Sequence, residues 1–379
     1  MTQAQSEYKP GLEGVIAAET RRSYVNGQIG QLLIGGYPLA DIAGQATFEE
    51  VVYLLWHDRL PSADELADLQ AKLAALRPLP PATLTLLQTI APAGAPVMDA
   101  LRMAAGTLSL GLDATDTDTL ALALVARFPT IVATYWRLLQ GQEPIPPTAD
   151  LGHAANYLYM LKGERPSPAQ TRGMTTYLNT VSDHGLNVSA FTARVIISTQ
   201  SDLVSAITGA VGALKGPLHG GAPGPALDMV FEIAQADRAE VYLRAKIERG
   251  ERLMGFGHRV YKVRDPRAEV LAAAAETLYQ ADGDMALYEM AKSVEQTAVT
   301  LLAEYKPGRN LQTNVEFYTA LLLHGLGLDT ALFTPTFAVG RVGGWLGHCF
   351  EEMANGRIIR PKELYVGEMN RQWVPLEER

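Results

Sequence analysis

Hydrophobic residues recur every three or four positions along most of this chain, a spacing that places side chains on one face of an α-helix. The leucines at positions 66, 69, 73 and 76 are a clear example. A capping box, in which serine or threonine is followed three residues later by glutamate, precedes such runs at Ser62–Glu65 and at Thr47–Glu50. Proline directly after a capping residue marks further helix starts at Ser167-Pro168 and Asp265-Pro266. The pattern predicts a mostly α-helical chain.

Strand-like alternation of hydrophobic and polar residues is confined to the N-terminal part of the chain, up to Tyr37. Two short runs there flank Asn26-Gly27, a pair suited to the positive φ values of a tight hairpin turn. We therefore expect an all-α fold with a small N-terminal β-ribbon.

The composition is that of a globular protein, because 47% of the 379 residues are hydrophobic and 19% are charged. The net charge of −9 argues against nucleic acid as a partner. The single cysteine, Cys349, fits a reducing compartment. No apolar run reaches the roughly 20 residues that span a bilayer, since the best candidate, residues 121–136, is interrupted by Arg127 and Pro129. We expect a cytoplasmic protein with no membrane partner.

Three segments place polar residues among glycines or in apolar surroundings. His219 is followed by two glycines, which let a ligand approach the backbone closely. Glu316 is a lone carboxylate in a largely apolar stretch. The third segment concentrates four cations within nine residues of an acidic chain, at the start of a predicted helix, where backbone N–H groups favour anions: Arg259, Lys262, Arg264 and Arg267.

Two classes of site are disfavoured. Gly255-x-Gly257 is followed by Val260 where a dinucleotide fingerprint needs a third glycine, and no strand precedes it. No two of the seven histidines are spaced i, i+4 and there is no cysteine cluster, so we expect no metal site. The residues by themselves indicate an anion-binding enzyme that uses histidine and carboxylate, and they leave the reaction open.

Taken together, these segments resemble the citrate synthase family, from about Gly11 to Arg379. The resemblance rests on several long motifs in the family's order: Phe48–Trp56, Ser182–Asn187, P-L-H-G-G-A at 217–222, G-F-G-H-R-V-Y-K at 255–262 with Asp265–Arg267, and Thr334–Trp345. It implies a two-domain helical homodimer, with a large domain at 1–220 and 326–379 and a small domain at 221–325. It also implies that oxaloacetate binds first and that the small domain then closes.

The resemblance implies a transferase that condenses acetyl-CoA with oxaloacetate to citrate and CoA, the citrate-forming step of the tricarboxylic acid cycle. The steps are enolate formation, aldol-type attack and thioester hydrolysis, with no cofactor and no metal. In this family's terms Glu316 matches the base, His219 the donor to the thioester oxygen, and His258 the residue that protonates the ketone.

Oxaloacetate carries two carboxylates, and guanidinium groups bind carboxylates bidentately. The positions that match the family's oxaloacetate ligands are His184, Arg267, Arg341 and, supplied by the other subunit, Arg360. We expect CoA to be bound by Lys262, with Arg264 and the backbone of Met254, Gly255 and Gly257 as weaker candidates.

One departure is important, because Glu316 stands where the family usually has aspartate. The extra methylene shifts the carboxylate by about an ångström. A displacement of that size lowers the reaction rate about 100-fold when the surrounding residues do not adjust. We interpret Glu316 as a re-accommodated base. Two alternatives stay open. The first is 2-methylcitrate synthase, which uses propionyl-CoA. This substrate is one methylene longer than acetyl-CoA, and an enzyme discriminates against one methylene by only roughly 10–200-fold in kcat/KM. The second is a catalytically silent acyl-CoA-binding homologue.

Overall fold

The computed structural model describes residues 8–220, 223–282 and 284–379. Its longer helices are α3 (Phe48–His57), α4 (Ala63–Leu76), α5 (Pro81–Ile90), α6 (Val97–Ala105), α7 (Thr117–Leu139), α8 (His153–Lys162), α9 (Pro168–Val181), α10 (Val188–Ile197), α11 (Leu203–Leu214), α12 (Pro223–Ile233), α13 (Ala239–Glu248), α14 (Pro266–Asp282), α15 (Met285–Tyr305), α16 (Val315–Gly325) and α17 (Phe333–Asn355). The short elements are α2 (Leu39–Ile42), β1 (Ser23–Asn26), β2 (Gln31–Ile34) and β3 (Tyr37–Pro38). The predicted helical class is confirmed.

The capping residues begin their helices where the sequence predicts. The side chains of Thr47, Ser62 and Ser167 accept hydrogen bonds from the backbone N–H three residues later, at 3.2, 3.3 and 3.1 Å. All three form complete capping boxes. Such a cap stabilises a protein by about 1 kcal/mol. Helix α14 begins at Pro266, also as predicted.

The predicted β-ribbon is present, but its turn differs from the expectation. Strands β1 and β2 pair antiparallel up to Asn26 opposite Gln31, so four residues form the loop, and β3 adds a third strand. The positive φ falls at Gly30 (+67°) instead of Gly27, so the prediction of a tight turn at Asn26-Gly27 was wrong. Gly27 is needed for close packing, because a Cβ there would lie 2.2 Å from the backbone oxygen of Val260.

Helix α7 lies in the core and corrects a second expectation. It is continuous over 23 residues, so Arg127 and Pro129 do not interrupt it. By length and composition it could cross a membrane, but 83% of its apolar stretch is buried inside the protein, the situation of a core helix. Arg127 is itself buried and donates to the backbone oxygens of Leu76 and Pro78, at 3.1 and 3.2 Å. Those hydrogen bonds allow a charged residue to sit in the core.

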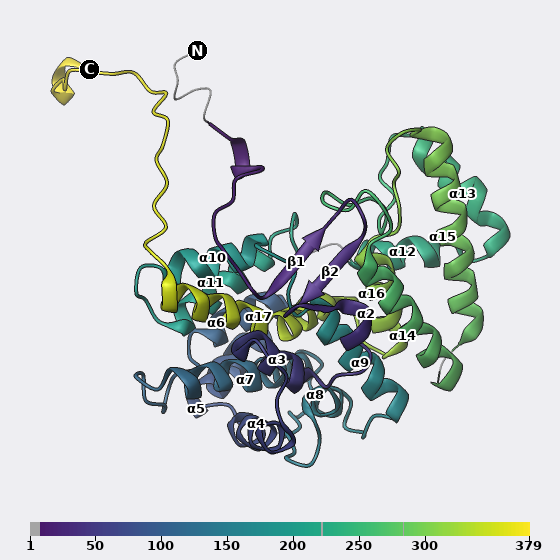
Figure 1. The fold of residues 1–379 in the computed structure, drawn as a ribbon, viewed down its shortest axis with the longest axis horizontal. Coiled ribbons are helices and arrows are strands. Elements are labelled where there is room, and N and C mark those ends of the chain that lie inside the picture. The colour runs from purple at the N-terminus through teal and green to yellow at the C-terminus, as the bar shows by residue number, and fades with distance from the viewer. Residues whose placement is uncertain (1–7, 221–222, 283) are drawn as a thin grey trace.

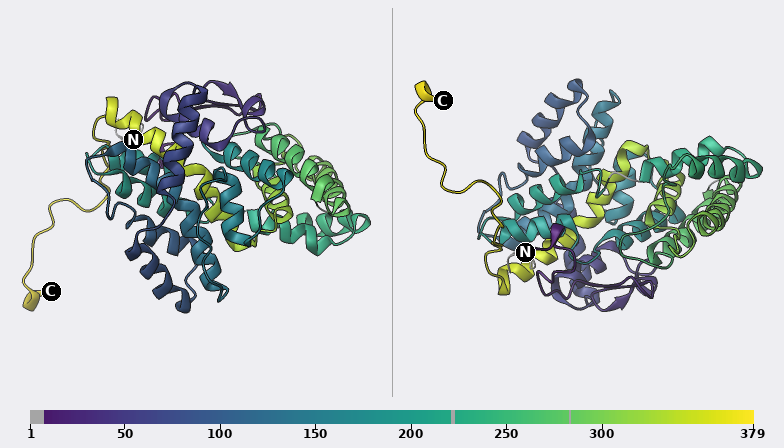
Figure 2. Two further views of the ribbon diagram at one scale, coloured as in Figure 1. Left: turned by 90° about the horizontal axis from the view of Figure 1, so that it is seen from below. Right: turned by 90° about the horizontal axis from the view of Figure 1, so that it is seen from above.

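Helix α17 runs through the middle of the molecule and contacts α3, α7, α9, α10 and α11 (Figure 1). Helices α12 to α16 gather at one end, with α13 and α15 farthest from α4 and α5 (Figure 2). Between these regions α14 packs on both α9 and α16. The site described below lies where these groups of helices meet. The domain limits at 221 and 325 remain a prediction.

After α17, residues 356–379 leave the body as an extended arm (Figures 1 and 2). Large apolar side chains on this arm are exposed, namely Ile358, Tyr365, Val366, Met369, Trp373 and Leu376. Apolar side chains on an arm that makes little contact with its own body are typical of an interaction surface.

Candidate active site

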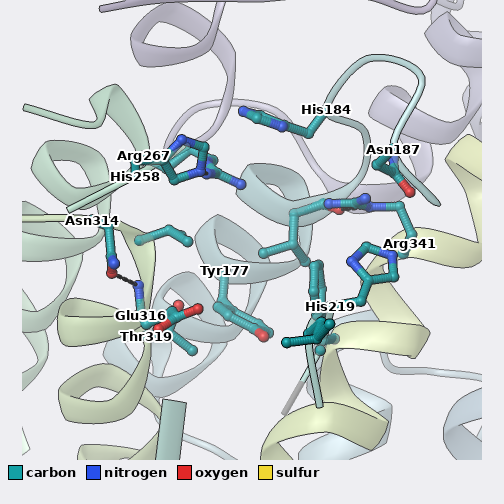
Figure 3. A pocket seen from close by; sticks show the side chains of 15 residues that line it. Tyr177, His184, Asn187, His219, His258, Arg267, Asn314, Glu316, Thr319 and Arg341 are labelled. Carbon is teal, nitrogen blue, oxygen red and sulfur yellow. Dashed lines mark hydrogen bonds between the residues drawn. The ribbon is translucent and has the colours of Figure 1, made fainter. Parts of the chain in front are cut away.

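A cavity of about 250 Å³ brings six of the predicted site residues together. Figure 3 shows their side chains around a common space. They are His184, His219, His258, Arg267, Glu316 and Arg341. Their positions span more than 150 residues of sequence, so the cavity exists only in the folded chain.

Helix ends and loops supply most of these side chains. His184 lies between α9 and α10, His219 follows α11, and His258 lies in the loop before α14. Arg267 and Glu316 are in the first turns of α14 and α16. The N-cap of α16 fixes the backbone of Glu316, since Asn314 Oδ1 accepts a hydrogen bond from the Glu316 N–H at 2.9 Å. Arg341 differs, because it comes from the middle of α17.

The hydrogen bonds of His219 assign its neutral tautomer. Its Nε2 faces both the backbone N–H of Ser189 (3.3 Å) and the Ser189 hydroxyl (2.8 Å). That hydroxyl accepts from Trp345 Nε1 at 3.0 Å, which fixes its position. Because a backbone N–H can only donate, Nε2 is the acceptor and Nδ1 carries the proton. Burial, aided by Arg341, lowers the pKa of His219 to about 4, so the ring is a neutral donor at pH 7.

His258 is assigned in the same way, with the opposite tautomer. Its Nδ1 accepts from the backbone N–H groups of Val260 (3.0 Å) and Tyr261 (3.1 Å), so Nε2 carries the proton. Burial and the charge of Arg267 lower the pKa of His258 to about 4. An Nη2 of Arg267 lies 3.3 Å from Nε2. Because Nε2 carries the proton, this contact joins two donors and is not a hydrogen bond, and an oxygen atom placed between them would accept from both.

Glu316 is a carboxyl group in a poorly solvated position. Its carboxylate accepts no hydrogen bond from the described residues, while its backbone is held by Asn314. Burial raises the pKa of Glu316 to about 7, although the charge of Arg267 acts in the other direction. A carboxylate that titrates near neutrality is well matched to proton abstraction.

Arg267 is a guanidinium group with a fixed orientation. Asp265 accepts from its Nε at 3.0 Å and from its Nη2 at 2.7 Å, both within the protein interior. Burial acts to lower the pKa of Arg267, but Asp265 outweighs it and the pKa is raised. Nη1 makes no hydrogen bond with the described residues.

Arg341 is a buried cation whose acidic neighbour among the described residues, Asp183, acts on it only through its charge. It is 1% exposed, and no carboxylate of the described residues forms an ion pair with it. Its Nε donates to the backbone oxygen of Val181, and its guanidinium carbon lies 4.7 Å from the centre of the Phe337 ring. Burial lowers the pKa of Arg341 to about 10, so it remains charged at pH 7. Because a buried charge is costly unless it is paired, an anion bound in the cavity would stabilise Arg341.

His184 links two of the loops. Its Nε2 lies 3.0 Å from the hydroxyl of Tyr261, and its ring meets that of His258 edge to face at 6.0 Å. Burial, with Arg267 and Arg341 nearby, lowers the pKa of His184 well below its usual value. The ring is therefore neutral when it faces the cavity.

The remaining predicted site residues do not line this cavity. Arg360 is exposed on the C-terminal arm. Lys262 is exposed, and Arg264 forms an ion pair with Glu295 at 2.6 Å. Met254, Gly255 and Gly257 form the loop that precedes His258, where the two glycines have φ near +80°. A Cβ at Gly255 would also lie 2.9 Å from Phe317 Cβ.

Several lining residues were not identified from the sequence, among them Tyr177, Asn187, Asn314, Thr319 and Phe337. Asn187 and Phe337 lie within the motifs quoted above, but only their position in the fold shows that they face the cavity. Asp265 and Ser189, which orient Arg267 and His219, were missed as well. Among the described residues no group of three or more His, Cys, Asp or Glu side chains is placed to hold a metal ion. The absence of a metal requirement stays a prediction.

Fold and cavity indicate a class of protein, a helical enzyme whose cavity suits a small organic anion and places neutral histidines beside a carboxyl group. The family model "Citrate synthase, C-terminal domain" matches residues 11–362. The chain belongs to the citrate synthase family, whose members are transferases.

Individual relatives agree with this family. "Citrate synthase 2" of Bacillus subtilis is 42% identical, over 97% of this chain and 98% of its own length. "2-methylcitrate synthase" of Shewanella oneidensis is 37% identical over the full length of both chains. A citrate synthase of Thermoplasma acidophilum, solved as a ternary complex with carboxymethyl coenzyme A and oxaloacetate, is 30% identical with a TM-score of 0.88, over 98% of this chain and all of its own.

Proposed function

We propose that this chain condenses acetyl-CoA with oxaloacetate to give citrate and CoA. The observation that carries the proposal is Arg341, a buried guanidinium group that forms no ion pair among the described residues. It shares a cavity with Arg267, two neutral histidines and Glu316. A small dicarboxylate supplies the missing negative charge, and its keto oxygen is an acceptor for the donors at His258.

In the first step Glu316 takes a proton from the methyl group of acetyl-CoA. Carbon acids of this kind are weak, so the enolate oxygen needs a donor as charge develops on it. His219 offers Nδ1–H for this purpose, because Ser189 occupies the other ring nitrogen. A neutral donor keeps its own proton while the enolate forms, and it is held in place before the reaction begins.

In the second step the enolate carbon attacks the ketone of oxaloacetate. The developing alkoxide accepts the proton of His258 Nε2, whose ring is oriented by two backbone N–H groups. The proton that Glu316 took from the methyl group then returns the ring to its neutral form. Arg267 and Arg341 hold the carboxylates, and His184 provides a further polar contact. Water then hydrolyses the thioester of the condensed product, which releases CoA. No cofactor is needed for these steps.

We assign CoA binding to the loop that precedes α14. Lys262 is an exposed cation on this loop, which also carries Met254, Gly255 and Gly257. Arg264 is a weaker candidate because Glu295 already pairs with it. The buried thiol Cys349 agrees with a reducing, cytoplasmic location.

We also propose that the active unit is a homodimer in which Arg360 enters the site of the other subunit. Of the two arginines in this chain's cavity, Arg267 is paired with Asp265, and the charge of Asp183 acts on Arg341. A dicarboxylate therefore needs a further cation. Arg360 lies on an arm that leaves its own body and carries exposed apolar side chains, which supports its contact with a second copy.

The experiment that tests the proposed activity follows thiol release by purified protein with oxaloacetate and either acetyl-CoA or propionyl-CoA. We expect release with acetyl-CoA at the higher kcat/KM. A preference for propionyl-CoA would point to 2-methylcitrate formation. Release with neither donor, while oxaloacetate still binds, would mean a silent homologue and would overturn the proposal.

The variant Glu316→Gln tests the assignment of the base. It removes the proton acceptor but leaves both arginines, so we expect turnover to fall by at least about 1,000-fold. Oxaloacetate should still bind, as measured by titration calorimetry. Glu316→Asp is the matched control, because it keeps the carboxylate on a shorter side chain and should retain part of the rate. A Gln variant with most of its activity would show that the base lies elsewhere.

A further inference from the structure

The β1–β2 hairpin contacts two loops of the active site, one at its base and one at its tip. At the base, the Ser23 hydroxyl donates to Asp183 Oδ2 at 2.5 Å and accepts from the Gly185 N–H at 2.6 Å. These two residues flank His184 in the chain. Ser23 is 9% exposed and Asp183 is fully buried, so the contact is shielded from water.

At the tip, the hairpin lies against the loop that carries His258. The backbone oxygen of Gly27 accepts from the Lys262 N–H at 2.8 Å. A Cβ at Gly27 would lie 2.2 Å from the backbone oxygen of Val260, a distance that real Cβ atoms do not reach. A Cβ at Gly30 would lie 2.9 Å from Val263 Cγ2. The tip therefore fits this loop only when it carries glycine.

The loop that packs against the tip holds the ring of His258. The N–H groups of Val260 and Tyr261 hold His258 Nδ1, and the Tyr261 hydroxyl lies 3.0 Å from His184 Nε2. The opposite side of the loop is braced by hydrogen bonds from Asn310 to Lys262 O (2.6 Å) and from Asn314 to Gly257 O (2.8 Å). The hairpin thus supports the His258 loop from the N-terminal segment, while Asn310 and Asn314 support it from the segment before α16.

We propose that the hairpin is a positioning element for catalysis, with Ser23 setting the His184 loop and Gly27 setting the loop of His258. The inference rests on the proposed function, in which His184 contacts oxaloacetate and His258 protonates its ketone. Neither Ser23 nor Gly27 lines the cavity, so both act through the histidines that do. The two ends of the hairpin should consequently give different kinetic defects.

The variant Gly27→Ala tests the tip. Gly27 has no positive φ, so alanine introduces no backbone strain of its own and acts through the contact with Val260. The loop must move by about an ångström, and we expect kcat to fall by about tenfold or more. Calorimetric titration with oxaloacetate should still give the wild-type stoichiometry. The control is Gly44→Ala, where the new methyl meets only Thr176 Oγ1, at 4.0 Å.

The variant Ser23→Ala tests the base. It leaves the Gly185 N–H and Asp183 without their shared hydroxyl, which loosens the His184 loop. We expect the KM and Kd for oxaloacetate to rise by about fivefold or more, with kcat within about threefold of wild type. Ser23→Thr keeps the hydroxyl and should restore affinity.

A purely structural role gives a different result, because loss of folded protein lowers kcat and binding stoichiometry together and leaves both KM values unchanged. That outcome, or wild-type kinetics in both variants, would overturn the inference. If Gly27→Ala does not fold, Ser23→Ala with its threonine rescue decides the question. If wild-type protein binds oxaloacetate but releases no thiol, the proposed function fails, while the effect of Ser23→Ala on binding still tests the hairpin.

Discussion

At the scale of single residues, the cavity depends on side chains whose charge states are set by their surroundings. Burial drives Glu316 toward its neutral form and keeps both His219 and His258 uncharged. Arg341 stays ionised without an ion pair among the described residues. The residue types were evident from the sequence, but these charge states follow from desolvation, which a linear pattern does not contain.

The raised pKa of Glu316 predicts the pH dependence of the reaction. The base acts in its ionised form, and its pKa is about 7, so protonation removes activity as the pH falls. Below pH 7 we expect kcat/KM for acetyl-CoA, the substrate that Glu316 deprotonates, to fall by about tenfold per pH unit. His219 and His258, with pKa values near 4, stay neutral above pH 5 and add no second limb there. A profile that is flat between pH 5.5 and 8 would contradict this assignment.

The unpaired charge of Arg341 makes a prediction about stability as well as binding. In Arg341→Met the buried charge is removed, so the free energy of unfolding should stay within about 1 kcal/mol of wild type or increase. Oxaloacetate binding should be lost in calorimetry. Arg341→Lys keeps the charge but not the planar fork and should bind weakly. A strongly destabilised Met variant that still binds oxaloacetate would assign Arg341 a structural role.

At the scale of secondary structure, most helix starts follow from local hydrogen bonding. The boxes at Thr47, Ser62 and Ser167 were readable because a cap and its partner lie three residues apart. The hairpin turn and helix α7 were misjudged because distant contacts decided them. Glycine at position 27 allows the hairpin to pack against the backbone of Val260. The backbone oxygens of Leu76 and Pro78 accept hydrogen bonds from Arg127, which allows this charged side chain to lie in the core.

The exposed cap of α4 tests the energetic value of such a signal. Ser62→Ala removes the acceptor for the Glu65 N–H, and we expect a loss of about 1 kcal/mol in unfolding free energy. Catalysis should be unaffected, since α4 does not contribute to the cavity. Ser62→Asp, which can still cap, is the control in chemical denaturation. Equal stability of the Ala and Asp variants would mean that the cap contributes nothing measurable.

At the scale of the whole molecule, segments far apart in the sequence converge on one cavity, and the C-terminal arm leads away from it. An arm with exposed apolar side chains and a cation at position 360 is unexplained within a single chain. In the proposed homodimer, a second copy covers these apolar side chains and receives Arg360. Sharing a site between subunits makes activity depend on assembly, which a mixing experiment can measure.

Two inactive variants should complement one another if Arg360 acts across the dimer. In a hybrid of Glu316→Gln and Arg360→Ala chains, one site receives both an intact Glu316 and an intact Arg360. Random mixing of equal amounts should restore about a quarter of wild-type turnover. If Arg360 serves its own chain, every site stays defective and no activity returns. Native mass spectrometry of the same mixture measures whether the subunits have exchanged.

The sequence by itself determined the helical class, the positions of most helix starts and the kinds of side chain available for catalysis. These features follow from short-range periodicity and capping, and from motifs that lie within a few residues of one another. Only the tertiary structure decided which side chains share the cavity, which ring nitrogen of each histidine carries the proton, and how the hairpin braces two loops. Those properties depend on desolvation and on contacts between distant segments, which exist only once the chain is packed.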